Sequence, residues 1–121
     1  EEPIELARAI VTQSSPETLV VVDCLTLWLT NLLMPMPSED APPVTRTPAT
    51  HVAMLLAALR EARGPVVLVG NEIGLGVIPL GRETRAFVDA LGRLNQDVAA
   101  ACGRVTLMAA GLPLSLKAPA A

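Results

Sequence analysis

Two acidic residues of this chain stand where buried strands would end. Asp23 directly follows the apolar run of residues 19–22, and Glu72, with Asn71 before it, comes soon after the apolar run of residues 66–69. In open α/β sheets, ligands bind beyond the carboxyl ends of the strands. A carboxylate in the position of Asp23 can hold Mg²⁺ beside nucleotide phosphates, and an aspartate there can equally cap the helix that follows. The spacing therefore points to a site at this sheet edge and leaves both roles of Asp23 open.

The Asn71–Glu72 pair also has two interpretations. The pair can orient a substrate or a metal-bound water, or it can form a turn that satisfies backbone donors ahead of the glycines. Gly74 and Gly76 do not complete a dinucleotide-binding fingerprint, because no third glycine opens a helix and Pro79 follows. The sequence also contains no glycine-rich phosphate loop ending in Gly-Lys-Ser or Gly-Lys-Thr.

The remaining reactive side chains suggest structural roles. His51 is the sole histidine, and its sequence neighbours offer no partner for a base or nucleophile, so we interpret it as a residue on a helix surface. Cys24 and Cys102 are too few for a disulfide framework or a four-ligand zinc site, and we expect them to pack as small apolar groups. Trp28 lies in an apolar segment and is interpreted as a core or interface residue.

Helical and strand-like apolar patterns alternate along the chain. Helical spacing occurs at residues 4–12, 25–34, 49–63 and 82–102, and strand-like runs occur at residues 19–22, 66–69, 105–110 and 114–117. The first two runs are continuously apolar, which predicts strands buried on both faces. Residues 34–48 hold five of the 11 prolines and predict a loop. The alternation predicts an α/β fold with a mostly parallel sheet.

Composition narrows the class of protein. The chain has 121 residues, is 51% hydrophobic and has a formal net charge of -3, which suits one globular domain and excludes intrinsic disorder. One lysine, scattered arginines and 2% aromatic residues argue against a nucleic-acid partner. We see no membrane span and no signal peptide, and therefore expect a cytoplasmic protein.

Three stretches taken together resemble one enzyme family. They are VVVDCLTLWLTNLL (20–33), VLVGNEIGLGVIP (67–79) and GRETRAFVDALGRLNQDVAAACGRVTLMAAGLPLSLK (81–117). With D-C-L-T, T-N-L-L, N-E-I-G-L-G and G-R-L-N-Q in this order, the chain is similar to the C-terminal two-thirds of the bifunctional adenosylcobinamide kinase/adenosylcobinamide-phosphate guanylyltransferases of cobalamin biosynthesis. The resemblance covers nearly the whole chain apart from the proline-rich segment.

The resemblance implies a fold, an activity and partners. It implies a three-layer, RecA-like P-loop NTPase fold, of which residues 1–121 would be the C-terminal part of a single nucleotide-binding domain. The implied enzyme phosphorylates adenosylcobinamide with ATP or GTP. It then transfers GMP from GTP, through a guanylylated histidine, to adenosylcobinamide phosphate, giving adenosyl-GDP-cobinamide. Mg²⁺ is the implied cofactor, and a homo-oligomer, a trimer, is the implied assembly.

The resemblance also implies roles for single residues. Asp23 matches the family's acidic residue at the end of its Walker B-like strand, which contacts the nucleotide or Mg²⁺. Glu1 matches an acidic residue that contacts the guanine nucleotide. Asn71 and Glu72 match the N-E motif at the next strand exit and are implied to bind the nucleotide.

The sequence departs from the family pattern in several places. The phosphate loop and the nucleotide-accepting histidine belong N-terminal to Glu1, so we expect no catalytic residue within this chain and no activity from the chain alone. Gly70 stands where related sequences carry Ser or Thr, which removes a hydroxyl near the site. Arg93 and Asn95, in G-R-L-N-Q, are expected to serve structure or subunit contacts.

An alternative hypothesis of a different class stays open. The chain would then be a non-catalytic remnant that acts as a binding or assembly module. Both hypotheses share one expectation, because a parallel sheet that lacks an N-terminal strand and helix exposes apolar surface and favours self-association.

Overall fold

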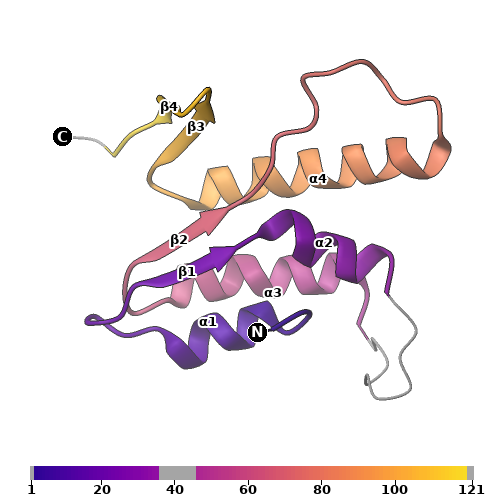
Figure 1. The fold of residues 1–121 in the computed structure, drawn as a ribbon. Coiled ribbons are helices and arrows are strands. Elements are labelled where there is room, and N and C mark those ends of the chain that lie inside the picture. The colour runs from indigo at the N-terminus through magenta and orange to yellow at the C-terminus, as the bar shows by residue number, and fades with distance from the viewer. Residues whose placement is uncertain (1, 36–45, 120–121) are drawn as a thin grey trace.

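The computed structural model describes residues 2–35 and 46–119 (Figure 1). In chain order these residues form α1 (Leu6–Gln13), β1 (Val20–Asp23), α2 (Leu25–Leu33), α3 (Pro48–Glu61), β2 (Val66–Val69), α4 (Arg82–Ala101), β3 (Val105–Ala109) and β4 (Leu112–Lys117). The predicted order of helices and strands is confirmed, and the fold is mixed α/β. Of the predicted loop 34–48, residues 36–45 lie outside the described part. Pro48 is the first residue of α3, a position where proline is favoured because the first helical N–H needs no partner.

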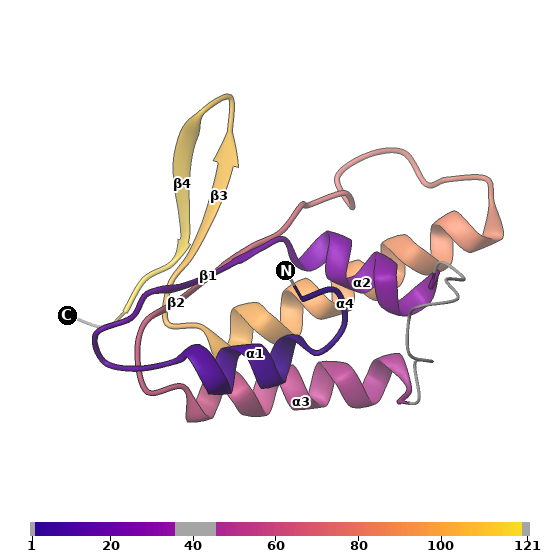
Figure 2. The ribbon, with the colours of Figure 1, turned by 60° about the horizontal axis from the view of Figure 1, so that its bottom comes forward.

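The strands form two separate two-stranded sheets in the described residues. β1 and β2 run parallel, with Val20 opposite Val66 and Asp23 opposite Val69. β3 and β4 form an antiparallel hairpin that projects away from the helices (Figure 2). The expectation of a mostly parallel sheet therefore holds for one of the two strand pairs.

The turn of the hairpin explains this correction. Only Ala110 and Gly111 connect β3 to β4, and both have positive φ angles of 53° and 73°. These angles are typical of the type I′ turn, which joins antiparallel strands, whereas a parallel connection needs a dozen or more residues. At the other end of the hairpin, Lys117 Nζ donates hydrogen bonds to the carbonyl oxygens of Ala99 (2.9 Å) and Ala100 (3.3 Å). The hairpin is thereby attached to the last turn of α4, where a cation also opposes the helix dipole.

The hydrophobic core is built around α3, which contacts α1, α2 and α4. Ile10 of α1, Leu55 of α3 and Leu91 of α4 are fully buried there. Trp28 of α2 is 4% exposed, and its indole N–H donates a hydrogen bond to the carbonyl oxygen of Ile4 at 2.8 Å. The expectation that Trp28 is a core residue is confirmed.

One face of the parallel pair is open in the described residues. Val22 is buried at 8% exposure, while Val21, Val67 and Val69 are 56%, 47% and 42% exposed. Successive side chains of a strand point to opposite faces, and α1 and α3 lie on one side of the two strands (Figure 2). The prediction that both strands are buried on both faces is therefore wrong for these residues, because the core packs against one face only.

His51 is buried, not on a helix surface as expected. Its exposed fraction is 4%. The buried stripe of α3 consists of His51, Leu55 and Ala58, spaced i, i+4 and i+7. Val52 and Leu59, which also lie at helical spacing along α3, are only partly buried. The apolar residues of α3 allow either stripe, and contact with the neighbouring helices selects the one that contains His51.

A buried serine joins the segments that lead into the two parallel strands. Ser14, which ends α1, is 2% exposed, and its Oγ accepts hydrogen bonds from the backbone N–H groups of Arg63 (2.7 Å) and Gly64 (3.1 Å). The guanidinium of Arg63 also donates to the Ser14 carbonyl oxygen at 3.3 Å. The backbone of Gly64 lies so close to Ser15 that an added Cβ would collide with the Ser15 carbonyl group. This contact requires glycine at position 64.

None of the helices in the described ranges has the length and apolar character that crossing a membrane requires.

Candidate functional site

The carboxyl ends of β1 and β2 lie side by side because the strands are parallel neighbours (Figure 1). Asp23 ends β1 opposite Val69, which ends β2, and Asn71 and Glu72 follow two and three residues later. The structure thus brings three of the four predicted site residues to one sheet edge, where all three are exposed. The fourth, Glu1, lies outside the described residues.

The structure excludes one of the two roles of Asp23. The N-cap of α2 is Cys24, whose Sγ accepts a hydrogen bond from the backbone N–H of Leu27 at 3.4 Å. Asp23 precedes this cap and belongs to the strand. The capping interpretation of Asp23 is therefore wrong, and its exposed carboxylate stands at the strand end. Cys24 is half-buried and contributes to the helix through its sulfur, so it is more than the small apolar group expected.

Both backbone groups of Asn71 are held by neighbouring helices. Its N–H donates a hydrogen bond to Thr26 Oγ1 of α2 at 2.9 Å, and its carbonyl oxygen accepts one from Asn95 Nδ2 of α4 at 3.2 Å. We call these two hydrogen bonds the Asn71 clamp. The clamp fixes the residue that follows β2 relative to two helices, and it leaves the Asn71 side chain exposed at the sheet edge.

The clamp assigns Asn95 a structural role, as expected from the sequence. Thr26, its other member, was missed by sequence reasoning. The available signal was a hydroxyl side chain three residues after Asp23 in an otherwise apolar segment, which places it on the first turn of α2. Arg93 is exposed on α4, and its expected subunit contacts are not tested by the structure.

Glu72 forms the turn that was one of its two interpretations. Its Oε1 accepts a hydrogen bond from the backbone N–H of Gly74 at 2.7 Å. The carboxylate thus orders the start of the loop between β2 and α4. If Glu72 binds a ligand, its carboxylate must either accept the Gly74 N–H and contact the ligand at the same time, or give up the hydrogen bond to Gly74.

Position 70 has room for a side chain. A Cβ added to Gly70 would lie 3.7 Å from Asn95 Oδ1, 3.7 Å from Leu25 Cβ and 4.0 Å from Thr26 Oγ1, which are ordinary van der Waals contacts. A serine here would place its hydroxyl next to the Asn71 clamp. The space that a larger residue would occupy is therefore present, although this chain has glycine.

A cavity of about 310 Å³ lies between α4 and the loop that follows Glu72. One wall is the loop that follows Glu72, with Ile73, Val77 and Pro79 among its lining residues, and the other wall is α4, with Arg85 and Asp89. The loop wall begins directly after the Asn71–Glu72 pair. Asp23, Asn71 and Glu72 themselves do not line the cavity.

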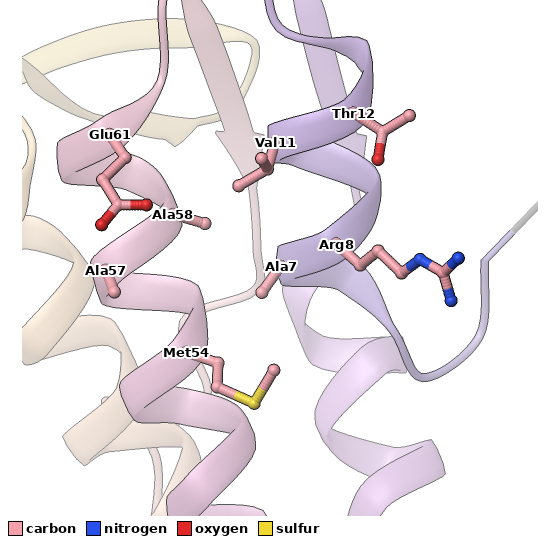
Figure 3. Close-up of a pocket in the computed structure, with 8 residues that line it drawn as sticks. All are labelled: Ala7, Arg8, Val11, Thr12, Met54, Ala57, Ala58 and Glu61. Carbon is pink, nitrogen blue, oxygen red and sulfur yellow. The ribbon is translucent and has the colours of Figure 1, made fainter.

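Another cavity, of about 290 Å³, lies between α1 and α3 and contains none of the candidate residues. Figure 3 shows Ala7 and Val11 of α1 facing Met54 and Ala58 of α3 across this space, with Arg8 directed away from it. This cavity is separate from the candidate site.

The donor groups at the sheet edge suit only one mode of metal binding. Among residues 2–35 and 46–119, no three His, Cys, Asp or Glu side chains group into a metal site. Mg²⁺ commonly binds one or two carboxylates together with water and substrate phosphates. Asp23, a single exposed carboxylate at a strand end, fits that mode and does not fit a cage made by protein alone.

The comparisons with known proteins all indicate the same family. The family model described as cobinamide kinase / cobinamide phosphate guanyltransferase matches residues 1–116. The bifunctional adenosylcobalamin biosynthesis protein CobP of Pseudomonas aeruginosa is 46% identical over 117 residues, which cover 97% of this chain. The bifunctional adenosylcobalamin biosynthesis proteins CobU of Escherichia coli and Salmonella typhimurium are 35% and 33% identical over 118 residues, which cover 93% of this chain.

The matches cover nearly all of this chain but only part of each relative. The chain spans 64% of the Pseudomonas protein and 65% of each of the other two. The family match nevertheless extends over almost every residue, including the strand ends that carry Asp23 and Asn71. The predicted resemblance is confirmed, and the chain belongs to the cobinamide kinase / cobinamide phosphate guanyltransferase family.

Proposed function

We propose that this chain is part of a cobalamin biosynthesis enzyme that phosphorylates adenosylcobinamide with ATP or GTP and then transfers GMP from GTP to the product. Adenosyl-GDP-cobinamide would be the final compound. The family description and the names of the relatives support this proposal. The structural observation that carries it is the exposed carboxylate of Asp23, which ends β1 beside the end of β2 and does not cap α2.

The proposal includes a P-loop NTPase fold. In such folds the parallel strands are covered by helices on both faces. The open face of β1 and β2, with Val21, Val67 and Val69 exposed, supports this part of the proposal because it supplies an apolar surface that further elements would cover. A homo-oligomer, a trimer, is also part of the proposal.

Asp23 is the residue that would hold Mg²⁺ in the proposed enzyme. When bound, Mg²⁺ would neutralise charge on the nucleotide phosphates. Asn71 and Glu72, with Glu1, are proposed to contact the nucleotide. The Asn71 clamp fixes the backbone at this point, so that the Asn71 amide is offered to the ligand from a defined position.

The histidine that carries GMP is proposed to lie outside this chain. His51 is the sole histidine here and is 4% exposed in α3, so it does not present a nitrogen to a nucleotide at the sheet edge. In the proposed reaction, a histidine nitrogen attacks the α-phosphate of GTP and pyrophosphate leaves. The phosphate of adenosylcobinamide phosphate then attacks the same phosphorus and releases the histidine.

The test uses the natural protein in its full length, incubated with Mg²⁺ and GTP labelled on the α-phosphate. We expect a covalent label that is stable to base and labile to acid, as for a phosphoramidate on histidine. Asp23→Asn should lower the labelling rate at least about tenfold, because electrostatic stabilisation of transferring phosphates is a large term in catalysis. Asp97→Asn, which changes an exposed aspartate of α4, is the matched control. Absence of labelling by the unchanged protein would refute the proposal.

A non-catalytic binding or assembly module is the second candidate. The observation that favours it is the apolar exposure of β1, β2 and the hairpin, where Leu112 and Leu116 are 69% and 60% exposed. This candidate predicts self-association without GTP binding or labelling. Sedimentation and calorimetry with GTP on the same protein separate the two functions.

A further inference from the structure

The loop between β2 and α4 exposes five large aliphatic side chains, of which Ile73 is 40% exposed and the other four are more than three-quarters exposed. Leu75 is 82% exposed, Val77 96%, Ile78 77% and Leu80 95%. We call residues 73–80 the aliphatic loop. Clusters of apolar side chains this exposed mark surfaces that bind something apolar.

The aliphatic loop is held at both ends. At its start, Glu72 Oε1 accepts the Gly74 N–H, and the Asn71 clamp fixes the preceding residue. At its end, Arg85 Nη1 of α4 donates hydrogen bonds to the carbonyl oxygens of Pro79 (3.2 Å) and Leu80 (2.7 Å). The exposed side chains are therefore presented by a backbone that is tied to the rest of the fold.

The cavity of about 310 Å³ lies between the aliphatic loop and α4. Its lining is aliphatic on the loop side, whereas the α4 side carries Val88, the Arg85 guanidinium and the Asp89 carboxylate. Its volume is at the lower end of small-molecule sites and suits one arm of a large ligand. A hydrogen-bond donor such as a primary amide matches the Asp89 carboxylate.

These features select one substrate of the proposed enzyme. A corrinoid is a broad macrocycle whose rim carries methyl groups and arms that end in carboxamides. A purine nucleotide would instead call for aromatic or polar partners, and the aliphatic loop contains no aromatic residue. The loop begins directly after Asn71 and Glu72, so it connects the proposed nucleotide site to the cavity along the chain.

We infer that the aliphatic loop and the adjoining turns of α4 bind the corrinoid substrate, an inference that rests on the proposed function. The macrocycle lies on Leu75, Val77 and Leu80. One carboxamide arm enters the cavity, where its N–H donates a hydrogen bond to Asp89. Arg85 is a positioning residue, because it fixes the loop rather than the ligand.

The test measures binding of dicyanocobinamide to the full-length natural protein by equilibrium dialysis, read from the visible absorbance of the corrinoid. Leu80→Asp and Val77→Asp should each weaken binding about tenfold or more, since a charge replaces an aliphatic side chain that the bound macrocycle would cover. Asp89→Asn should weaken it about fivefold, since a hydrogen bond to a charged group is exchanged for one to a neutral group. Leu112→Asp, on the hairpin, is the matched control and should bind as the unchanged protein does.

GTP binding and sedimentation are measured on the same variants. Val77 and Leu80 are more than nine-tenths exposed, so their substitution should leave thermal unfolding unchanged. Unchanged corrinoid affinity in both loop variants overturns the inference, as does a loss of assembly without a loss of corrinoid affinity, which would make the loop a contact between copies. Absence of both GTP and corrinoid binding in the unchanged protein refutes the proposed function itself, which distinguishes the two failures.

Discussion

Each of the two hydrogen bonds of the Asn71 clamp can be removed by a single substitution. Thr26→Val removes the acceptor of the Asn71 N–H and keeps the shape of the side chain. Asn95→Ala removes the donor to the Asn71 carbonyl oxygen. Each hydrogen bond is worth about 1 kcal/mol net. Valine and threonine have similar helix propensities, so Thr26→Val should cost about 1 kcal/mol, whereas Asn95→Ala regains roughly 0.5 kcal/mol of helix propensity in α4 and should cost only about 0.5 kcal/mol.

Global stability is therefore a weak reporter of the clamp, and local opening is a strong one. Hydrogen exchange of the Asn71 amide should be about fivefold faster in Thr26→Val, the factor that corresponds to about 1 kcal/mol. In the full-length protein, both variants should weaken GTP binding by a similar factor. The double variant should fall short of the sum of the two effects by about 0.5 kcal/mol or more, since both bonds hold one residue.

Asn31→Ala is the matched control. Asn31 Nδ2 of α2 donates to the Pro3 carbonyl oxygen at 3.1 Å, so the same substitution removes a bond of the same kind from a helix. It should lower stability as Asn95→Ala does and leave GTP affinity unchanged. Equal weakening of GTP binding by the Asn31 and Asn95 variants, or unchanged exchange of the Asn71 amide in Thr26→Val, would refute the reasoning.

Three further predictions concern stability and reactivity. Gly70→Ser should change the free energy of unfolding by less than about 0.5 kcal/mol because a Cβ fits there, whereas Gly64→Ala should cost about 3 kcal/mol because its Cβ meets the Ser15 backbone; equal losses in urea denaturation would contradict this. Burial raises the pKa of the Cys102 thiol, so its alkylation by iodoacetamide should need a higher pH than a free cysteine does, and the rate profile against pH checks this. The preference for the neutral thiol stabilises the fold below the thiol's unfolded pKa, and this stabilisation is lost as pH rises through the higher folded value. Ala110→Gly should raise stability by about 1 kcal/mol because it relieves a positive φ at a residue with a Cβ, and an unchanged thermal midpoint would contradict it.

The sheet edge could be predicted because its logic is local. Apolar runs locate the strands, and parallel neighbours bring their ends together, so Asp23 and Asn71 were expected at one place. The clamp itself was not predictable, since its hydrogen bonds join residues 45 and 24 positions apart in the sequence. Such pairs depend on how α2 and α4 pack against the strand exit, and residue spacing along one element carries no information on that.

Burial was harder to predict than position along the chain. The run that contains Val21 is apolar throughout, and it does not say which face has a partner. His51 was misplaced for a related reason, because α3 offers more than one apolar stripe and the contacts with other helices choose among them. Both errors concern tertiary packing, which the pattern of one element does not determine.

The hydrogen bonds of Ser14 bear on the far end of the strands. Together with the bond from the Val20 N–H to the Pro65 carbonyl oxygen at 3.1 Å, they fix where β2 starts relative to β1. A slip of one residue in this register would turn every side chain of β2 to the opposite face and give Asp23 a neighbour other than Val69. The Ser14 hydroxyl, which lies where the two strands begin, therefore helps to determine which residues are neighbours where the strands end. Substitutions at Ser14 can alter the candidate site without any contact with it.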